Sequence, residues 1–155
     1  MLLHLRARLS YAVARRLFHW SWLVKQPRAW RWMEGRFARM ANLGNVAAQS
    51  FYGHILLFRG QGFGAREEGM RLLRLAAGAG DAKSAYQVGV SSLAGDTRQA
   101  PDAGEAARCW KIAADAGHPL AAQRLAELYR QGASGLPADA EQAAHYSARA
   151  RELGL

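Results

Sequence analysis

The chain has 155 residues, of which half are apolar and 21% are charged. This length and composition suit about one globular domain and exclude a wholly disordered chain. The single cysteine, Cys109, excludes an intramolecular disulfide framework and a cysteine-built zinc site. No apolar stretch approaches the roughly 18 uncharged residues of a membrane-spanning helix.

The positive charge is concentrated near the start of the chain. Residues 1–43 hold nine basic residues and a single acid, Glu34, whereas residues 44–155 hold 12 basic and 11 acidic residues. A basic segment of this kind favours an anionic partner, such as a membrane surface or a polyanion.

The first predicted element is an amphipathic helix over residues 2–25. Its apolar residues recur every three or four positions, which is helical spacing: Leu2, Leu5, Leu9, Val13, Leu17, Trp20 and Val24. Pro27 is expected to end this helix, and a second helix is predicted from about Arg28 to Leu43.

Three interpretations of residues 1–43 compete. They could form a degenerate repeat that caps the rest of the chain, or a targeting peptide that is rich in arginine and poor in acids. They could also form a peripheral membrane helix, in which Arg8, Arg15, Trp20 and Trp22 contact anionic lipid. Nucleic-acid binding is disfavoured, because the chain contains no recognisable nucleic-acid-binding module.

The remainder of the chain repeats. Glycine recurs at positions 44, 80, 117 and 154, and similar small residues precede it, as in Ala113-Ala114-Asp115-Ala116-Gly117. This spacing predicts three repeats, at 44–79, 80–116 and 117–154, after an N-terminal segment at 1–43.

Each repeat is predicted to be a pair of helices. The first helix places core residues 4, 8 and 12 positions after the glycine, and small residues at 53, 89 and 126 allow close helix packing. Glycine-rich loops, the first at 60–64, should separate the two helices. Asp102 with Glu105, and Asp139 with Gln142, predict capping boxes at the second helices, and the repeat glycines predict left-handed C-caps.

This pattern resembles the Sel1-like repeat family, close relatives of the tetratricopeptide repeats. The resemblance implies an all-α fold, a right-handed α-solenoid of stacked antiparallel helix pairs that serves protein–protein contacts, often in bacterial signalling or envelope assembly. Three residues depart from the family pattern: Ser92 replaces an aromatic residue, Arg59 replaces a glycine, and Ser147 replaces a bulky residue.

No motif for catalysis or cofactor binding is convincing, so no cofactor, metal or enzymatic activity is expected. Residues 78–84 resemble a phosphate-binding loop but lack the glycines that such a loop requires. No two of the five histidines have the spacing of metal ligands on a helix. Cys109 is expected to be a buried, inert thiol.

The function predicted from these patterns is that of a scaffold or adaptor, which binds an unidentified protein partner on the concave surface of the first helices. Seven residues are predicted to line that surface: His54, Leu57, Phe58, Tyr86, Val90, Glu127 and Arg130. A competing explanation is that the basic segment or the solenoid curvature covers them. The alternative function is a recruiter anchored at an anionic membrane. The expected location is the cytoplasm, with peripheral attachment to the inner membrane under the alternative function.

Overall fold

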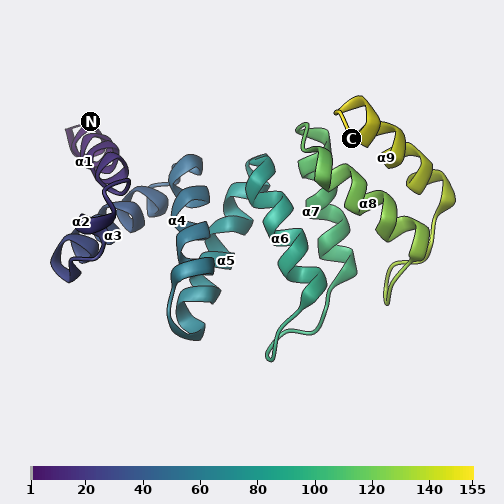
Figure 1. The fold of residues 1–155 in the computed structure, drawn as a ribbon, viewed down its shortest axis with the longest axis horizontal. Helices are drawn as coiled ribbons and strands as arrows, with labels where there is room; N and C mark the ends of the chain where they lie inside the picture. The colour runs from purple at the N-terminus through teal and green to yellow at the C-terminus, as the bar shows by residue number, and fades with distance from the viewer. Residues whose placement is uncertain (1) are drawn as a thin grey trace. The chain divides into compact units, whose positions relative to one another are not determined.

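The protein is seen in a computed structural model that describes residues 2–155, apart from the side chains of Leu2, Leu3 and Phe63. Nine helices make up the regular structure of this part of the chain (Figure 1), together with one isolated bridge between Ala133 and Leu136. The helices are α1 (Leu2–Leu17), α2 (Ser21–Val24), α3 (Pro27–Asn42), α4 (Val46–Arg59), α5 (Gly62–Gly78), α6 (Ala82–Ala94), α7 (Ala103–Asp115), α8 (Pro119–Gln131) and α9 (Ala140–Glu152).

The chain divides into two compact units, Met1–Leu72 and Leu73–Leu155, and the division falls within α5. We refer to them as the N-terminal unit and the C-terminal unit. Each unit has its own cluster of buried apolar side chains.

The core of the N-terminal unit is aromatic. Phe37 of α3 is fully buried and contacts Tyr11 and Phe51 edge to face, with ring centroids 6.1 Å and 5.1 Å apart. Phe18, which follows α1, packs against both phenylalanines at 6.1 Å and 5.3 Å. These T-shaped contacts are favourable beyond the apolar area that they bury, and they hold α1 against α3 and α4.

The prediction of one continuous helix over residues 2–25 is wrong. Helix α1 ends at Leu17, and a turn over Phe18–Trp20 leads into the short α2. No proline or glycine marks this break. Phe18 packs among Phe37, Phe51 and Trp30, so tertiary aromatic packing outweighs the local preference for a continuous helix. The second predicted helix is confirmed as α3.

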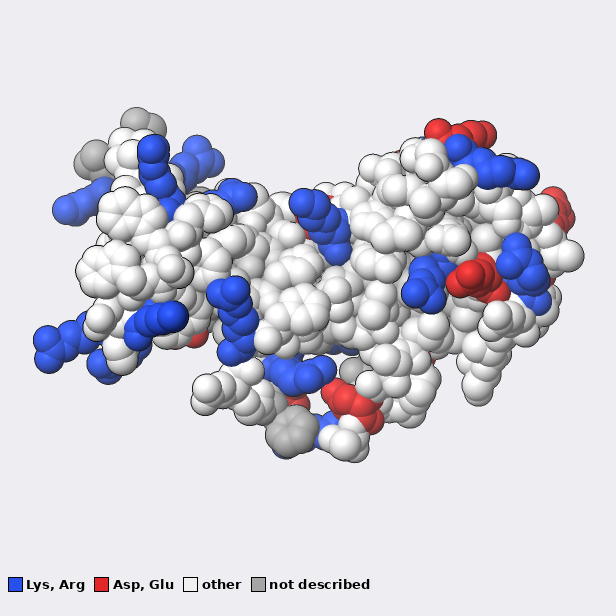
Figure 2. All heavy atoms as spheres, in the orientation of Figure 1, with Lys and Arg blue, Asp and Glu red and all other residues white. Residues whose placement is uncertain are grey.

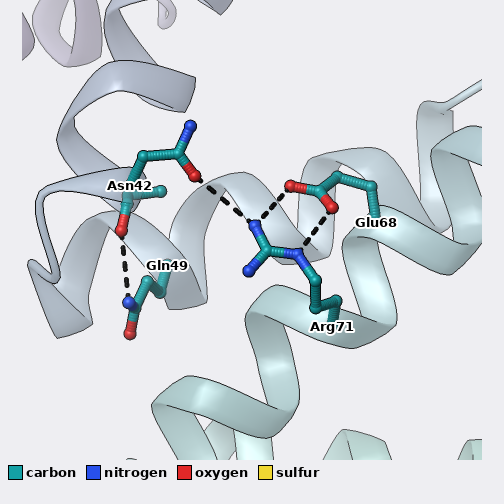
Figure 3. Close-up of polar contacts among 5 residues, drawn as sticks. Asn42, Gln49, Glu68 and Arg71 are labelled. Carbon is teal, nitrogen blue, oxygen red and sulfur yellow. Dashed lines mark hydrogen bonds and ion pairs between the residues drawn. The ribbon is translucent and has the colours of Figure 1, made fainter.

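Polar contacts join α3, α4 and α5 within the N-terminal unit (Figure 3). The buried Gln49 donates a hydrogen bond to the Ala41 carbonyl at 3.2 Å, and Arg71 donates to both carboxylate oxygens of Glu68 at 2.7 Å and to Asn42 Oδ1 at 3.4 Å. Helix α5 also lies close to α4. A Cβ atom added to Gly69 would lie only 2.9 Å from the Gly53 carbonyl oxygen, which is closer than van der Waals contact.

The C-terminal unit packs α6 against α7, α7 against α8 and α8 against α9. Between α6 and α7, the buried Trp110 indole covers Gly89 so closely that a methyl group there would overlap the ring. The small residue predicted at position 89 therefore allows close packing, as expected.

The repeat glycines are left-handed C-caps, as predicted. Gly44, Gly80, Gly117 and Gly154 have φ between 81° and 98°. The residue after each of the first three glycines is the N-cap of the next helix, which was not predicted: Asn45, Asp81 and His118. The predicted core positions are confirmed at 4 and 8 residues after each of these three glycines, all of which are buried. At 12 residues after the glycine, Leu56 and Ser92 are buried, whereas Tyr129 is only half-buried. The first loop is shorter than predicted, since α5 begins at Gly62.

The two predicted capping boxes are half formed. Asp102 and Asp139 accept hydrogen bonds from the backbone N–H groups of Glu105 and Gln142, at 2.8 Å and 3.0 Å. The return bond is absent at α7, because the Asp102 N–H donates to the Ser92 carbonyl at 2.8 Å. The Glu105 carboxylate instead accepts hydrogen bonds from Arg74 and Ser92.

Candidate partner-binding surface

Two of the three residues predicted to bind a partner in the N-terminal unit reach the surface of α4. Phe58 is 66% exposed, and its ring stacks on the half-buried His54 with centroids 6.3 Å apart. His54 Nδ1 lies 2.7 Å from the Ser50 carbonyl oxygen, which can only accept, so Nδ1 carries the proton. Leu57 is only 7% exposed and faces the interior, so it adds no area to this surface.

A cavity of about 450 Å³, which was not predicted, is lined in part by residues of α4 that neighbour His54 and Phe58 in the sequence. It has apolar walls that include Trp30 and Ile55, and it contains one acid and one base, Glu34 and Arg59. Tyr52 donates a hydrogen bond to Glu34 at 3.2 Å. Burial and the nearby carboxylate of Glu34 raise the pKa of Tyr52, so its hydroxyl stays protonated at neutral pH.

In the C-terminal unit, two predicted residues lie on α6. Val90 is 37% exposed, while Tyr86 is half-buried and stacks on His118 with ring centroids 4.5 Å apart. The Tyr86 carbonyl accepts a hydrogen bond from Trp110 Nε1 at 3.1 Å. Two contacts therefore position Tyr86: Trp110 binds its carbonyl group, and His118 stacks on its ring.

The other two predicted residues lie on α8 and are polar. Glu127 pairs with Arg124 at 3.8 Å, and Arg130 donates a hydrogen bond to Ser147 Oγ at 3.2 Å. Both contacts involve exposed or half-exposed side chains and contribute little to stability. The two charges are consequently free to exchange these contacts for a polar partner.

His118 positions α8 as its N-cap. Its Nδ1 accepts a hydrogen bond from the Ala121 N–H at 3.3 Å, so the ring is the neutral tautomer with the proton on Nε2. Burial lowers the pKa of His118, and the nearby charge of Lys83 adds to this effect. The neutral ring is therefore retained at physiological pH, and with it the stack on Tyr86.

The four residues predicted to contact a membrane differ in their surroundings. Trp20 and Trp22 are 57% and 62% exposed, and Arg8 is exposed. The guanidinium group of Arg15 lies over the Phe51 ring, 5.4 Å from its centroid, so Arg15 also contributes to packing within the unit.

Within the part of the chain that the structure describes, no group of His, Cys, Asp and Glu side chains could hold a metal ion. The same residues contain no helix with the length and apolar character needed to cross a membrane. Cys109 is buried, and burial raises the pKa of its thiol, which disfavours the reactive thiolate.

Comparison with known proteins identifies the fold. No family profile and no curated protein sequence matches the chain. Among solved structures, it is similar to a Sel1 repeat protein from Oxalobacter formigenes, at 24% identity and a TM-score of 0.68 over 78% of the chain. The chain has the fold of the Sel1-like repeat proteins. The predicted class, an all-α solenoid of stacked helix pairs, is thereby confirmed.

A second Sel1-like repeat structure is equally similar. It is a protective antigen of uropathogenic Escherichia coli strains that displays an SLR fold, at 20% identity and a TM-score of 0.68 over 79% of the chain. The chain spans about a quarter of the length of this antigen and about a third of that of the Oxalobacter protein.

Proposed function

We propose that the protein is a non-catalytic interaction scaffold that binds a segment of a protein partner on the exposed residues of its first helices. The Sel1-like repeat fold supports this proposal, since stacked helix pairs present a rigid row of side chains. The observation that carries it is the exposure of Phe58 and Val90 on the first helices α4 and α6. Apolar side chains that remain exposed beside ordered aromatic residues are typical of binding surfaces.

Within the N-terminal unit, the exposed Phe58 on α4 favours an apolar part of a partner. Within the C-terminal unit, the exposed Val90 on α6 also favours an apolar part, whereas Glu127 and Arg130 on α8 favour polar groups. Charged side chains at the rim of an interface govern the orientation and specificity of binding more than its affinity.

The test begins with short peptides selected from a display library on the immobilised full chain. The dissociation constant of the best peptide is then measured by calorimetry for the wild type, Phe58→Ala and Val90→Ala. We expect at least one substitution to weaken binding by about tenfold, because truncating a central apolar contact costs over 1 kcal/mol. Neither should lower thermal stability much, since both side chains are exposed.

The matched control is Leu75→Ala. Leu75 is 48% exposed on α5, a second helix of a pair, so it offers a similar apolar side chain outside the proposed surface. Peptide binding that is unchanged by Phe58→Ala and Val90→Ala, or lowered equally by Leu75→Ala, would contradict the assignment.

The second candidate function is recruitment to an anionic membrane surface. It is favoured by the exposure of Trp20 and Trp22 within a segment that carries nine basic residues. The full chain is expected to sediment with phosphatidylcholine vesicles that contain about 30 mol% phosphatidylserine, and to do so less in about 0.5 M salt. Equal sedimentation with pure phosphatidylcholine vesicles, or none with either kind, would exclude this function.

A further inference from the structure

Helix α1 exposes three aliphatic side chains to solvent. Leu5, Leu9 and Val13 are 57%, 62% and 52% exposed. They are spaced four residues apart, so they lie along one side of the helix. We call this set the outer ridge. Within the part of the chain that the structure describes, its members belong to neither buried cluster.

A different set of residues attaches α1 to the rest of the N-terminal unit. Ala7, Tyr11 and Ala14 are at most 8% exposed and belong to the buried cluster around Phe37. Ala7 and Leu9 are two positions apart and therefore point to nearly opposite sides of the helix. The small alanines allow α1 to approach the unit closely, while Leu5, Leu9 and Val13 remain exposed.

The outer ridge is bordered by positive charge. Arg6 and Arg8 are exposed and lie on either side of Leu9 around the helix, and the exposed Arg16 follows Val13 by three residues. Among the described residues, no ion pair is found for these three arginines. Figure 2 shows Lys and Arg atoms spread over α1–α3 with very few Asp or Glu atoms among them.

We propose that α1 lies in the plane of an anionic membrane, with the outer ridge inserted between lipid headgroups and the flanking arginines bound to lipid phosphates. This proposal rests on the second candidate function above and assigns the inserting residues, which are Leu5, Leu9 and Val13. Apolar residues on one side of a helix, arginines at its borders and tryptophans nearby are the features of an interfacial helix. The opposite face stays packed on Phe37, so binding leaves the unit folded.

The charge of the segment decides between possible occupants of the ridge. A second copy of the chain would bring another segment with nine basic residues and one acid, and like charges oppose their close approach. A soluble polyanion would pair with the arginines but would leave the leucines and valine in water. An anionic bilayer satisfies both the charges and the apolar side chains.

The experiment compares vesicle sedimentation of the full chain with that of the triple variant Leu5→Gln, Leu9→Gln, Val13→Gln. The vesicles are phosphatidylcholine with about 30 mol% phosphatidylserine. We expect the triple variant to bind more than about tenfold less tightly, because three inserting side chains are lost and no charge changes. A triple control, Leu43→Gln, Leu75→Gln, Leu120→Gln, replaces leucines of comparable exposure outside α1 and should bind as the wild type does.

The outcomes separate this inference from the function on which it rests. If the wild type does not sediment with anionic vesicles, the membrane function itself fails. If the wild type and the ridge variant sediment equally, the membrane function stands but the ridge assignment is overturned. A ridge-dependent dimer in light scattering, without vesicle binding, would show that a second copy occupies the ridge and would also overturn the proposal.

A second readout avoids the risk that the triple variant fails to fold. An environment-sensitive dye is attached at Leu9→Cys, in a Cys109→Ala background, and compared with the same dye at Leu120→Cys. Anionic vesicles should raise the emission severalfold at position 9 and leave position 120 unchanged, because only an inserted dye leaves water. No change at position 9 while the protein sediments would overturn the proposal.

Discussion

Trp110→Ala is expected to destabilise the C-terminal unit by about 3–5 kcal/mol, the usual cost of truncating a buried tryptophan. Trp110 is 3% exposed, covers Gly89 and donates a hydrogen bond to the Tyr86 carbonyl. The substitution would leave a cavity between α6 and α7 and would remove the indole hydrogen bond to the Tyr86 carbonyl. Chemical denaturation followed by circular dichroism at the helical wavelength measures the loss.

Gly89→Ala probes the same contact from the opposite helix. Alanine favours a helix over glycine by about 1 kcal/mol, but its methyl group would overlap the indole of Trp110. We therefore expect net destabilisation by about 1–3 kcal/mol. The double variant Gly89→Ala, Trp110→Ala should lose less than the sum of the two single losses, because the new methyl group occupies part of the cavity.

The control for this cycle is Trp22→Ala, the same substitution at a side chain that is 62% exposed. It should change the free energy of unfolding by less than about 0.5 kcal/mol. Strict additivity of the two single variants, or an equal loss for Trp22→Ala, would show that the packing of Trp110 on Gly89 is not what stabilises the α6–α7 pair.

Glu105→Gln is expected to cost about 2 kcal/mol, because it removes the charge from a partly buried hydrogen-bond network. Glu105 accepts hydrogen bonds from Arg74 at 2.7 Å and 3.0 Å and from Ser92 Oγ at 2.6 Å. Its side chain is only 18% exposed, whereas that of Arg74 is 37% exposed. Water can therefore still reach the unpaired Arg74, which keeps the loss below that of a fully buried pair.

The loss should depend on pH. Hydrogen bonds from Arg74 hold the pKa of Glu105 below its usual value, the bond from Ser92 adds to this effect, and burial partly opposes it. The carboxylate therefore contributes its full stabilisation above the unfolded pKa of about 4.3 and loses it as the pH falls through the lower folded pKa. The difference between the wild type and Glu105→Gln should be constant from about pH 6 to 8 and should shrink below about pH 4.

Glu152→Gln is the matched control for the loss of a carboxylate. Glu152 is 65% exposed and accepts one hydrogen bond from Arg149 at 3.2 Å, so the expected cost is at most about 0.5 kcal/mol. If Glu105→Gln costs no more than this control, or if its cost does not change between about pH 7 and pH 3, the network does not stabilise the unit as inferred.

The repeating part of the fold could be predicted because its local signals agree with its tertiary packing. The glycines at 44, 80, 117 and 154 end helices with positive φ, and the core residues of each first helix follow at fixed offsets. A turn that needs glycine, and a close contact that excludes a side chain, can both be recognised in the sequence because each requires a glycine or another small residue at a fixed position. The N-caps were missed only because Asn45, Asp81 and His118 differ in type while they share a position.

The N-terminal unit was predicted less well, because its packing reverses the expectation from hydrophobicity. The side of α1 with the aliphatic residues Leu5, Leu9 and Val13 is exposed, and the side with Ala7, Tyr11 and Ala14 is buried. Hydrophobic periodicity alone could not show which side of α1 packs against Phe37 of α3. Likewise, the cavity lined by Trp30 and Ile55 depends on residues of four separate helices, so no local spacing in the sequence indicates it.

Most of the predicted partner-binding residues are accessible, but their energetic roles could not be inferred from spacing. Tyr86 was chosen as a surface residue, yet its ring is half covered by His118. Leu57 lies next to Phe58 in the sequence and points inward. A stripe assigned from helical periodicity is uncertain by about one residue at its edges, which is enough to exchange a surface side chain for a buried one.

The contacts at equivalent junctions of the C-terminal unit differ in chemistry. Ser92 and Arg74 meet the carboxylate of Glu105, whereas the equivalent Tyr129 and Lys111 meet the ring and hydroxyl of Tyr146. If the chain folded with its helix pairs offset by one repeat, Arg74 would face Gln142, the residue 37 positions after Glu105, and would lose its carboxylate partner. Near-identical repeats are prone to such misalignment. The unlike polar contacts make the correct alignment lower in energy, so each helix pair recognises its own neighbour during folding.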